Sequence, residues 1–297
     1  MLIEKRLLVT GSTGFIGKKF LARIKGFDFK VIKTPKDLDL QNAELTSDFV
    51  QAADPHLILH LATNAKQLRE SPRTTVKLSP DDIDVNIVSA SLKLRNLKRF
   101  VSLGTCDEYG KHPNPYLETD LAMPVSGYGS SKLAMSNYLL EFAKNYDFPS
   151  VILRPSVVYG TDQPSTMFVP SLFSAMKEKR VFALTCGDQT RDFIFVEDLI
   201  DAIIKSFTED NIANGSIFNI ASQSSLPIKD VANKIADLFG PGYRSLLDFG
   251  ALDFRDSEVM DYRVNAEKAA SEINWRAKVS LDQGLRILKD SIVQTGF

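Results

Sequence analysis

Short runs of apolar and β-branched residues recur along the chain. They occupy residues 6–10, 30–32, 57–62, 100–103, 151–153 and 217–220. Most are apolar nearly throughout and do not alternate with polar residues, which is typical of parallel strands buried on both faces. Amphipathic stretches lie between them, for example at 15–25 and 132–144. A strand followed by a helix, repeated, predicts an α/β fold with a doubly wound parallel sheet of the Rossmann class.

The pattern changes after about residue 160, where segments rich in Gly, Pro, Asp and Gln interrupt shorter elements. We therefore expect a Rossmann domain over residues 1–160, with elements returning to it at about 188–221. Residues 161–187 and 222–297 are expected to form a smaller, mixed carboxy-terminal lobe that binds substrate. No stretch has the composition of a flexible linker, so the two parts should pack together around a cleft.

Composition and charge exclude several classes of function. The chain has 297 residues, 44% apolar and 25% charged, and a formal net charge of -1. This balance gives no electrostatic reason to expect nucleic-acid or membrane binding. Cys106 and Cys186 cannot build a disulfide framework, and no Cys or His spacing predicts a metal. The amino-terminal apolar run is too short for a signal peptide or a membrane span, so we expect a cytoplasmic protein.

The segment TGSTGFIG at 10–17 joins the first predicted strand to the first predicted helix. Two residues separate Gly11 from Gly14, and two separate Gly14 from Gly17. In dinucleotide-binding loops such glycines permit a tight turn, close approach of the backbone to a pyrophosphate, and close packing of helix on sheet. The helix amino terminus also favours an anion. This context predicts a cradle for a dinucleotide.

The residues after the second predicted strand leave the choice of nicotinamide cofactor open. Asp37 lies about where an acidic residue would bind the ribose 2′-hydroxyl of NAD(H). Lys33, Thr34 and Lys36 lie nearer the strand end at Ile32 and would suit the 2′-phosphate of NADP(H). We favour NADP(H), although these lysines would equally suit a solvated loop.

The segment SGYGSSKL at 126–133 contains the second candidate motif. Tyr128 and Lys132 are four residues apart at the start of a predicted helix and therefore share a face. An ammonium group beside a phenol stabilises the phenolate, so the tyrosine could exchange a proton with an alcohol or carbonyl at neutral pH. This pair alone is common by chance, but its combination with the glycine segment is specific.

With these two motifs the chain resembles the extended short-chain dehydrogenase/reductase superfamily, within it the NAD-dependent epimerase/dehydratase group that acts on nucleotide sugars. The resemblance covers essentially the whole chain. It includes HLAT at 60–63, GTCDEYG at 104–110, LRPSVVYG at 153–160, GDQTRDFIFVEDL at 187–199 and NW at 274–275. HLAT corresponds to the family's fourth strand, which lines the cofactor.

The resemblance implies a catalytic triad of Thr105, Tyr128 and Lys132, in which Lys132 also binds the nicotinamide ribose. It further implies cofactor contacts from three segments. These are Gly11, Thr13, Gly14, Phe15, Ile16 and Gly17, then Lys33, Asp39 and Leu40, then Leu61, Ala62 and Thr63.

Substrate contacts are expected from Cys106, Asp107, Arg191 and Arg255. By resemblance, the two arginines would bind the phosphates of a nucleotide-diphosphate sugar, for which a bidentate guanidinium is suited. Each could instead form a surface ion pair. A homodimer is left open, because the helix of 86–99 that normally helps to form it is shorter than the family usually allows.

The acidic residues after Thr105 bear on the reaction. Dehydratases of the family resemble T-D-E-x-Y-G, whereas here Asp107 takes the glutamate position and Glu108 abuts Tyr109. A carboxylate displaced by one residue points to the other side of an extended chain. This weakens a dehydratase interpretation, although Asp107 could still serve as an acid.

The form of GTCDEYG, with GDQTRDFIFVEDL, resembles the nucleotide-diphosphate 4-keto-6-deoxyhexose reductases of the CDP-abequose and CDP-paratose synthase type. We therefore expect NAD(P)H-dependent reduction of a 4-keto-6-deoxy nucleotide sugar. A 4-epimerase with tightly bound NAD is the first alternative and a 4,6-dehydratase the second. In a different class, a non-catalytic NAD(P)-binding sensor would have this fold without the reaction.

Overall fold

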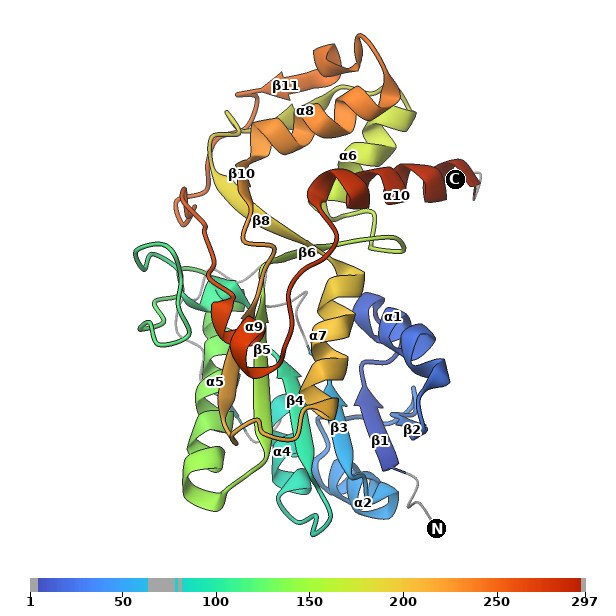
Figure 1. The fold of residues 1–297 in the computed structure, drawn as a ribbon, viewed down its shortest axis with the longest axis vertical. Helices are drawn as coiled ribbons and strands as arrows, with labels where there is room; N and C mark the ends of the chain where they lie inside the picture. Colours follow the sequence, from blue (N-terminus) through green and yellow to red (C-terminus); the bar gives the residue numbers. More distant parts are fainter. Residues whose placement is uncertain (1–4, 64–77, 80–81, 295–297) are drawn as a thin grey trace.

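The computed structural model describes residues 5–63, 78–79 and 82–294. Its main feature is a six-stranded sheet in which all neighbours are parallel, in the order β2-β1-β3-β4-β5-β9 (Figure 1). The strands are β1 Lys5–Thr10, β2 Phe29–Lys33, β3 Leu57–His60, β4 Arg99–Leu103, β5 Ser150–Pro155 and β9 Ser216–Ile220. Each predicted strand is confirmed. HLAT begins at the last residue of β3, the third strand of the described chain, and residues 34–42 between β2 and α2 form a loop.

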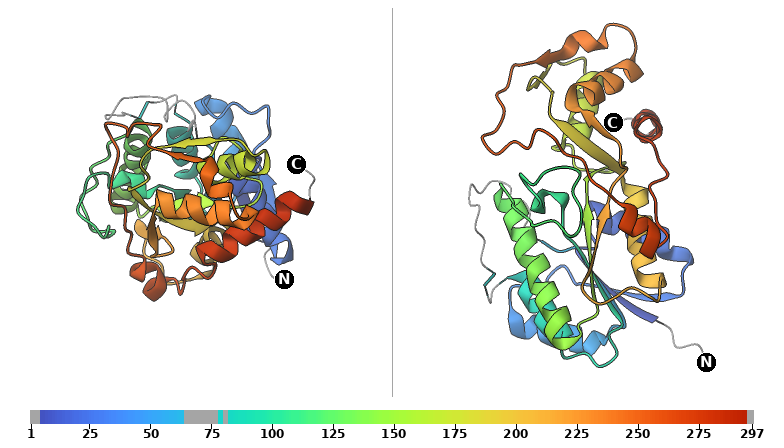
Figure 2. Two further views of the ribbon diagram at one scale, coloured as in Figure 1. Left: turned by 90° about the horizontal axis from the view of Figure 1, so that it is seen from above. Right: turned by 60° about the vertical axis from the view of Figure 1, so that its left-hand side comes forward.

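Side chains of the inner strands β3, β4 and β5 are buried on both faces, as the apolar runs predict, whereas the edge strand β2 is partly exposed. Leu7 and Val9 belong to one apolar cluster with helices α1 and α7, whereas Leu8 and Ile58 belong to another with α2, α4 and α5. Figure 2 (right) shows α5, in green, and α7, in yellow-orange, on opposite sides of the sheet. The helices are α1 Phe15–Arg23, α2 Ala43–Ala53, α4 Ile83–Ser91, α5 Gly127–Tyr146 and α7 Val196–Thr208, with a 3₁₀ turn η1 Ile24–Gly26 after α1.

The order of the strands reverses at β1. Strand β2 lies on one side of β1 and β3 lies on the other, so the connections that follow β1 and β3 diverge at the carboxyl edge of the sheet. Open α/β sheets bind their ligands in the crevice at such a switch point. The glycine segment follows β1, and Leu61 to Thr63 follow β3.

A smaller region stands above this sheet in Figure 1 and has its own apolar cluster. It holds a three-stranded sheet, β10-β8-β6, and a two-stranded sheet, β11-β7. Its elements are β6 Val157–Tyr159, α6 Phe168–Lys177, β7 Phe182–Leu184, β8 Thr190–Phe195, β10 Ser225–Pro227, α8 Ile228–Phe239, η3 Tyr243–Leu246, β11 Leu247–Phe249 and α10 Leu281–Gln294. Of the elements expected to return to the main sheet, α7 and β9 do so, whereas β8 pairs in the smaller region.

The chain crosses back to the main sheet after β11. The amide of Tyr116 donates to the carbonyl of Arg263 at 2.9 Å, and the amide of Asn265 donates to the carbonyl of Tyr116 at 3.0 Å. Helix α9, Glu267–Glu272, follows, and the indole of Trp275 donates to the carbonyl of Asp198 at 2.9 Å. This returning segment closes over the loops at the carboxyl edge of the sheet. No described helix has the length and apolar character needed to cross a membrane.

Candidate active site

The glycine segment forms a tight turn between β1 and α1. Gly11 has φ of +65°, and a Cβ on it would lie 2.6 Å from the carbonyl carbon of Leu61. A Cβ on Gly17 would lie 2.4 Å from the carbonyl oxygen of Gly11. Gly14 is the N-cap of α1, and no side chain caps it. The first turn of α1 thus presents amides that no capping side chain covers, and these fit the pyrophosphate of a dinucleotide.

A buried chain of hydrogen bonds fixes the loop that faces this turn. Thr10 Oγ1 accepts from the amides of Leu61 and Ala62, each at 3.1 Å. With both lone pairs used, the hydroxyl donates to Nδ1 of His60 at 2.8 Å, and Nε2 of His60 donates to Oδ1 of Asp84 at 2.8 Å. This chain holds residues 61–63 against the glycine turn, where the cofactor-binding prediction places them.

The Asp84 carboxyl has a shifted pKa. Burial alone would raise this pKa, but the hydrogen bond from His60 and the positive charge of Lys132 outweigh that effect and lower it. Asp84 is therefore an ionised acceptor at the end of the chain of hydrogen bonds from Thr10.

The residues expected near the adenosine ribose lie on an open rim after β2. Lys33 and Asp39 are exposed, and Oδ1 of Asp39 accepts from the amide of Gln41 at 2.9 Å. Leu40 is buried, and its carbonyl accepts from Nδ2 of Asn86 at 3.0 Å. The rim therefore offers an ammonium group, which suits the 2′-phosphate of NADP(H), and a carboxylate, which suits the ribose 2′-hydroxyl of NAD(H).

Thr105 follows β4 and is the N-cap of a short 3₁₀ turn, η2 Cys106–Glu108. Its Oγ1 accepts from the amide of Asp107 at 3.2 Å. This turn touches the start of α5, where a Cβ on Gly129 would lie 2.7 Å from the carbonyl oxygen of Asp107. Only a glycine allows this approach, so residue 129 brings the turn and the helix together.

Lys132 and Tyr128 lie on the first turns of α5, as predicted. The Nζ of Lys132 is buried and donates to the carbonyl of Leu103 at 2.9 Å, at the end of β4. Tyr128 lies one turn earlier on the same helical face and is half-buried. Ser126 caps the helix by accepting from the amide of Gly129 at 3.0 Å. The structure thus brings Thr105, Tyr128 and Lys132 to one edge of the sheet.

Glu108 points into the core. The prediction that the chain after Thr105 is extended, with Glu108 on its other side, is wrong. The residues after Thr105 form a 3₁₀ turn and not an extended chain. The Glu108 side chain is fully buried, and its Oε2 accepts from Nη2 of Arg154 at 2.7 Å. Burial raises the pKa of the Glu108 carboxyl, and the Arg154 guanidinium opposes that rise. Glu108 is therefore unavailable to a substrate.

Cys106 and Asp107 point in different directions. The Cys106 thiol is fully buried and donates to the carbonyl of Arg154 at 3.1 Å, so its expected contact with substrate is wrong. Burial also raises the pKa of this thiol. Asp107 is exposed, and its Oδ1 accepts from the phenol of Tyr262 at 3.2 Å. Of the residues of η2, Asp107 alone presents a carboxylate to solvent in the described structure.

The two expected phosphate ligands lie in one region but differ in exposure. Arg191, on β8, is half-buried and pairs through Nη2 with Glu258, while its Nη1 donates to the carbonyl of Val259 at 2.7 Å. Arg255 is exposed, and its carbonyl accepts from the amide of Glu258 at 2.9 Å. The ion pair that was the alternative for Arg191 is thus present, and Arg255 presents its guanidinium to solvent.

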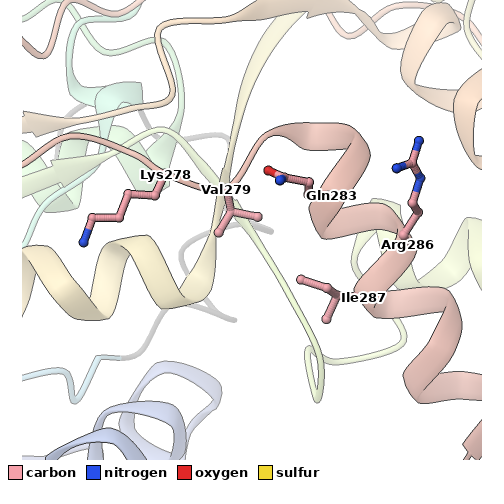
Figure 3. Close-up of a pocket in the computed structure, with 5 residues that line it drawn as sticks. All are labelled: Lys278, Val279, Gln283, Arg286 and Ile287. Carbon is pink, nitrogen blue, oxygen red and sulfur yellow. The ribbon is translucent and has the colours of Figure 1, made fainter.

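Two shallow surface pockets are lined by other residues. One, of about 380 Å³, is lined by Lys278, Val279, Gln283, Arg286 and Ile287, between α10 and the segment before it (Figure 3). The other, of about 430 Å³, is lined by Pro115, Gln223, Ser224, Ser225, Arg263, Val264 and Asn265. Neither contains a candidate catalytic or cofactor residue, and the chemistry at the sheet edge identifies the site better than these hollows do. Residues 5–63, 78–79 and 82–294 hold no cluster of His, Cys, Asp and Glu suited to a metal ion.

Three residues of this region escaped the sequence analysis. Arg154 pairs with Glu108, Glu258 pairs with Arg191, and Tyr262 donates to Asp107. A signal existed for Glu108 itself, because Thr105 and Glu108 have the T-x-x-E spacing of a capping box, which predicts a turn.

The comparison with protein families decides the assignment. Residues 7–221 match the model of the NAD dependent epimerase/dehydratase family. The chain belongs to this family. The match spans the glycine segment, the candidate catalytic turn formed by Thr105 and η2, and the start of α5, so it covers every candidate catalytic residue.

Relatives in the epimerase/dehydratase family catalyse more than one reaction. The CDP-abequose synthase of Salmonella muenchen is 24% identical over 306 residues, covering 96% of this chain and 97% of the relative. The dTDP-D-glucose 4,6-dehydratase of Bos taurus is 26% identical over 314 residues, covering 95% of this chain and 87% of the relative. Homologues thus modify nucleotide sugars. The synthase and the dehydratase are almost equally identical to this chain, so sequence identity does not show which reaction this chain catalyses.

Solved structures share the fold at low sequence identity. The dTDP-glucose 4,6-dehydratase of Bacillus anthracis in complex with NAD has a TM-score of 0.83 at 22% identity, covering 98% of this chain and 97% of that chain. The UDP-glucose 4-epimerase of Thermotoga maritima with UDP-glucose has a TM-score of 0.86 at 21% identity, covering 98% and 100%. RMD from Pseudomonas aeruginosa complexed with NADPH has a TM-score of 0.80 at 23% identity, covering 98% and 99%. The first of these neighbours is thus bound to NAD, the second to UDP-glucose and the third to NADPH.

Proposed function

We propose that this protein reduces the 4-keto group of a nucleotide-diphosphate 4-keto-6-deoxy sugar with NADPH or NADH. The observation that carries the proposal is that only one acidic side chain of the catalytic turn reaches solvent in the described structure. Glu108 and Cys106 are buried, and Asp107 is exposed with its carboxylate engaged by Tyr262. An elimination of water needs an acid and a base near the sugar, whereas a reduction needs the triad.

The candidate triad has the groups that a carbonyl reduction requires. The chemistry that a bound reduced nicotinamide supplies is hydride transfer to the keto carbon. Tyr128 would donate a proton to the keto oxygen as it becomes an alkoxide. The hydroxyl of Thr105 accepts from the amide of Asp107, and its own hydrogen can therefore be donated to the same oxygen. Lys132 supplies a positive charge on the face of α5 that carries Tyr128.

The cofactor preference and substrate contacts belong to this proposal. Lys33 on the open rim would favour the 2′-phosphate of NADP(H). Exposed Arg255, with Arg191 once its pairing with Glu258 is broken, would bind the diphosphate of the substrate. A cytoplasmic location and a homodimer stay predictions from the sequence.

Purified protein tests the proposal. It should oxidise NADPH when given a CDP-, dTDP- or GDP-linked 4-keto-6-deoxyhexose, and mass spectrometry should show a product heavier by two hydrogens. Tyr128→Phe should lose turnover at least about a hundredfold, with the dissociation constant of NADPH changed little. Tyr146→Phe, an exposed tyrosine on the same helix, is the matched control. NAD that survives purification, with interconversion of C4 epimers, would show an epimerase, and elimination of water would show a dehydratase.

A further inference from the structure

Glu108 and Arg154 form a buried ion pair directly behind the catalytic turn, and the proposed reaction uses neither group. Their side chains are 0% and 3% exposed. The Nε and Nη2 of Arg154 both contact the same oxygen, Oε2 of Glu108, at 2.8 and 2.7 Å. The other oxygen, Oε1, accepts from the backbone amide of Thr105 at 2.9 Å. One carboxylate thus joins the arginine to the candidate catalytic residue.

The stability of the fold gives no sufficient reason for such a pair. Taking two charges out of water is costly, and apolar residues of similar volume often stabilise a fold as well or better. The reason for the ion pair is therefore to be found in the group that it holds in place. It holds the backbone of Thr105.

The surroundings leave this carboxylate little freedom. A Cβ on Gly104 would lie 2.3 Å from Oε1 of Glu108, so a glycine is needed for the side chain to reach the Thr105 amide. On the other side, the guanidinium carbon of Arg154 lies 4.7 Å from the centre of the Tyr109 ring. The Tyr109 phenol in turn donates to Oδ1 of Asn219 at 2.7 Å. The ends of β4, β5 and β9 thus hold the pair in one orientation.

The two hydrogen bonds of the turn are reciprocal. The Glu108 carboxylate accepts from the Thr105 amide, and Oγ1 of Thr105 accepts from the Asp107 amide. Such a capping arrangement fixes both the backbone and the side-chain rotamer of the first residue. The direction of the Thr105 hydroxyl therefore depends on the position of Glu108.

We propose that Glu108, oriented by Arg154, is a positioning residue that aims the Thr105 hydroxyl at the reacting oxygen. The proposal rests on the proposed function, because that function gives the hydroxyl its task. A displacement of about 1 Å in a catalytic group can cost about a hundredfold in rate. The pair acts on turnover without touching substrate or cofactor.

The test separates positioning from stability with three variants. Glu108→Leu leaves the Arg154 charge buried and unpaired, so it should lower the midpoint of thermal unfolding. The double variant E108L/R154M removes both charges and should recover most of that loss. Both should still lower kcat by about tenfold or more, with KM and the dissociation constant of NADPH within about twofold of wild type. Glu108→Gln keeps the shape and offers one acceptor oxygen for three N–H donors, two of Arg154 and one of Thr105, so it should lower kcat less than Glu108→Leu does.

Trp275→Phe is the matched control. It removes a buried hydrogen bond to the carbonyl of Asp198, outside the cluster of Glu108 and Arg154, so it should lower thermal stability and leave kcat unchanged. A second readout needs no substrate. In protein labelled with ¹⁵N-threonine, the Thr105 amide should exchange with solvent faster in Glu108→Leu and in the double variant, and at the wild-type rate in Trp275→Phe.

Two results would overturn the proposal. One is a double variant with wild-type kcat, which would make the pair structural only. The other is slow Thr105 exchange after loss of Glu108. Because exchange is measured without substrate, it reports on this contact independently of the reaction. The failure of the proposed function would appear elsewhere, as unchanged turnover in Tyr128→Phe.

Discussion

The phenol of Tyr262 donates a 3.2 Å hydrogen bond to Oδ1 of Asp107, across 155 positions of the chain. The guanidinium carbon of Arg191 lies 5.3 Å from the centre of the same tyrosine ring. One buried tyrosine thus contacts both the exposed carboxylate of the catalytic turn and the arginine expected to bind phosphate. The carboxy-terminal part of the chain therefore sets the direction of Asp107.

Tyr262→Phe should remove this control of Asp107 and keep the ring that Arg191 contacts. We expect the free energy of unfolding to fall by about 1.5–3 kcal/mol, because a hydrogen bond to a charged group is lost. The value of kcat/KM should fall several-fold, since Asp107 is the residue of this turn that we expect to contact the substrate. Urea unfolding and steady-state kinetics measure the two effects, with Tyr146→Phe as control. An unchanged kcat/KM would show that Asp107 takes no part in substrate binding.

Thr10→Val should weaken cofactor binding. The change keeps the shape of the side chain but leaves the buried amides of Leu61 and Ala62 without their acceptor, at a cost of about 1–3 kcal/mol in unfolding free energy. The segment at 61–63 should loosen and raise the dissociation constant of NADPH, measured by fluorescence titration. Thr208→Val is the control, because that hydroxyl bonds only to the carbonyl of Ile204 among the hydrogen bonds described. Equal NADPH affinity in both variants would contradict the prediction.

The stability of the fold should depend on pH through Asp84. Its pKa is lower in the folded protein than the ordinary value of 3.8. A lowered pKa of an acid means that its contribution to stability is fully present above pH 3.8 and is lost as the pH falls through the folded value. Asp84→Asn should therefore be less stable than wild type at pH 5–7, and the difference should shrink below about pH 4. Urea unfolding across this range would reject the prediction if the difference were independent of pH.

Glu258 should compete with the diphosphate of a substrate for Arg191. Glu258→Gln removes the negative charge that pairs with this arginine, so CDP or dTDP should bind up to about tenfold more tightly, about 1.4 kcal/mol. Arg191→Lys should weaken binding, since a lysine cannot make the bidentate contact. Titration calorimetry measures both, with Glu267→Gln, which breaks the exposed pair with Arg276, as control. Tighter binding of CDP or dTDP to Glu267→Gln would show that the change in net charge, and not the loss of the Glu258–Arg191 pair, increases the affinity.

The main sheet could be predicted from the sequence because its signals are local. A strand buried on both faces is apolar at nearly every position, so the runs at 6–10 and 151–153 can be recognised as strands from the sequence. The pairing of β8 could not be predicted in this way. Strand β8 carries Arg191 and Asp192 ahead of a short apolar run at 193–195, and its partners β6 and β10 are short.

The candidate site was predictable where its residues lie in one motif. Gly11, Gly14 and Gly17, and likewise Tyr128 and Lys132, are each placed by a single turn or helix. Their roles in catalysis and cofactor binding stay predictions.

The error at Cys106 and Glu108 came from treating the residues after Thr105 as extended. A 3₁₀ turn rotates successive side chains by about a third of a turn, which sends these two inwards and Asp107 outwards. The partners of the turn, Arg154 and Tyr262, could not be found, because the contacts depend on how distant strands and segments pack.

The return of the chain to the main sheet at residues 262–265 also has a consequence for biosynthesis. Tyr116 and Asn219 both donate hydrogen bonds to backbone carbonyls of this returning segment. The phenol that donates to Asp107 also belongs to it. On a ribosome, the six strands of the main sheet can pair once Ile220 has emerged, whereas the loops at their carboxyl edge must wait for residue 265. A nascent chain arrested before that point would lack the contacts that complete the candidate active site.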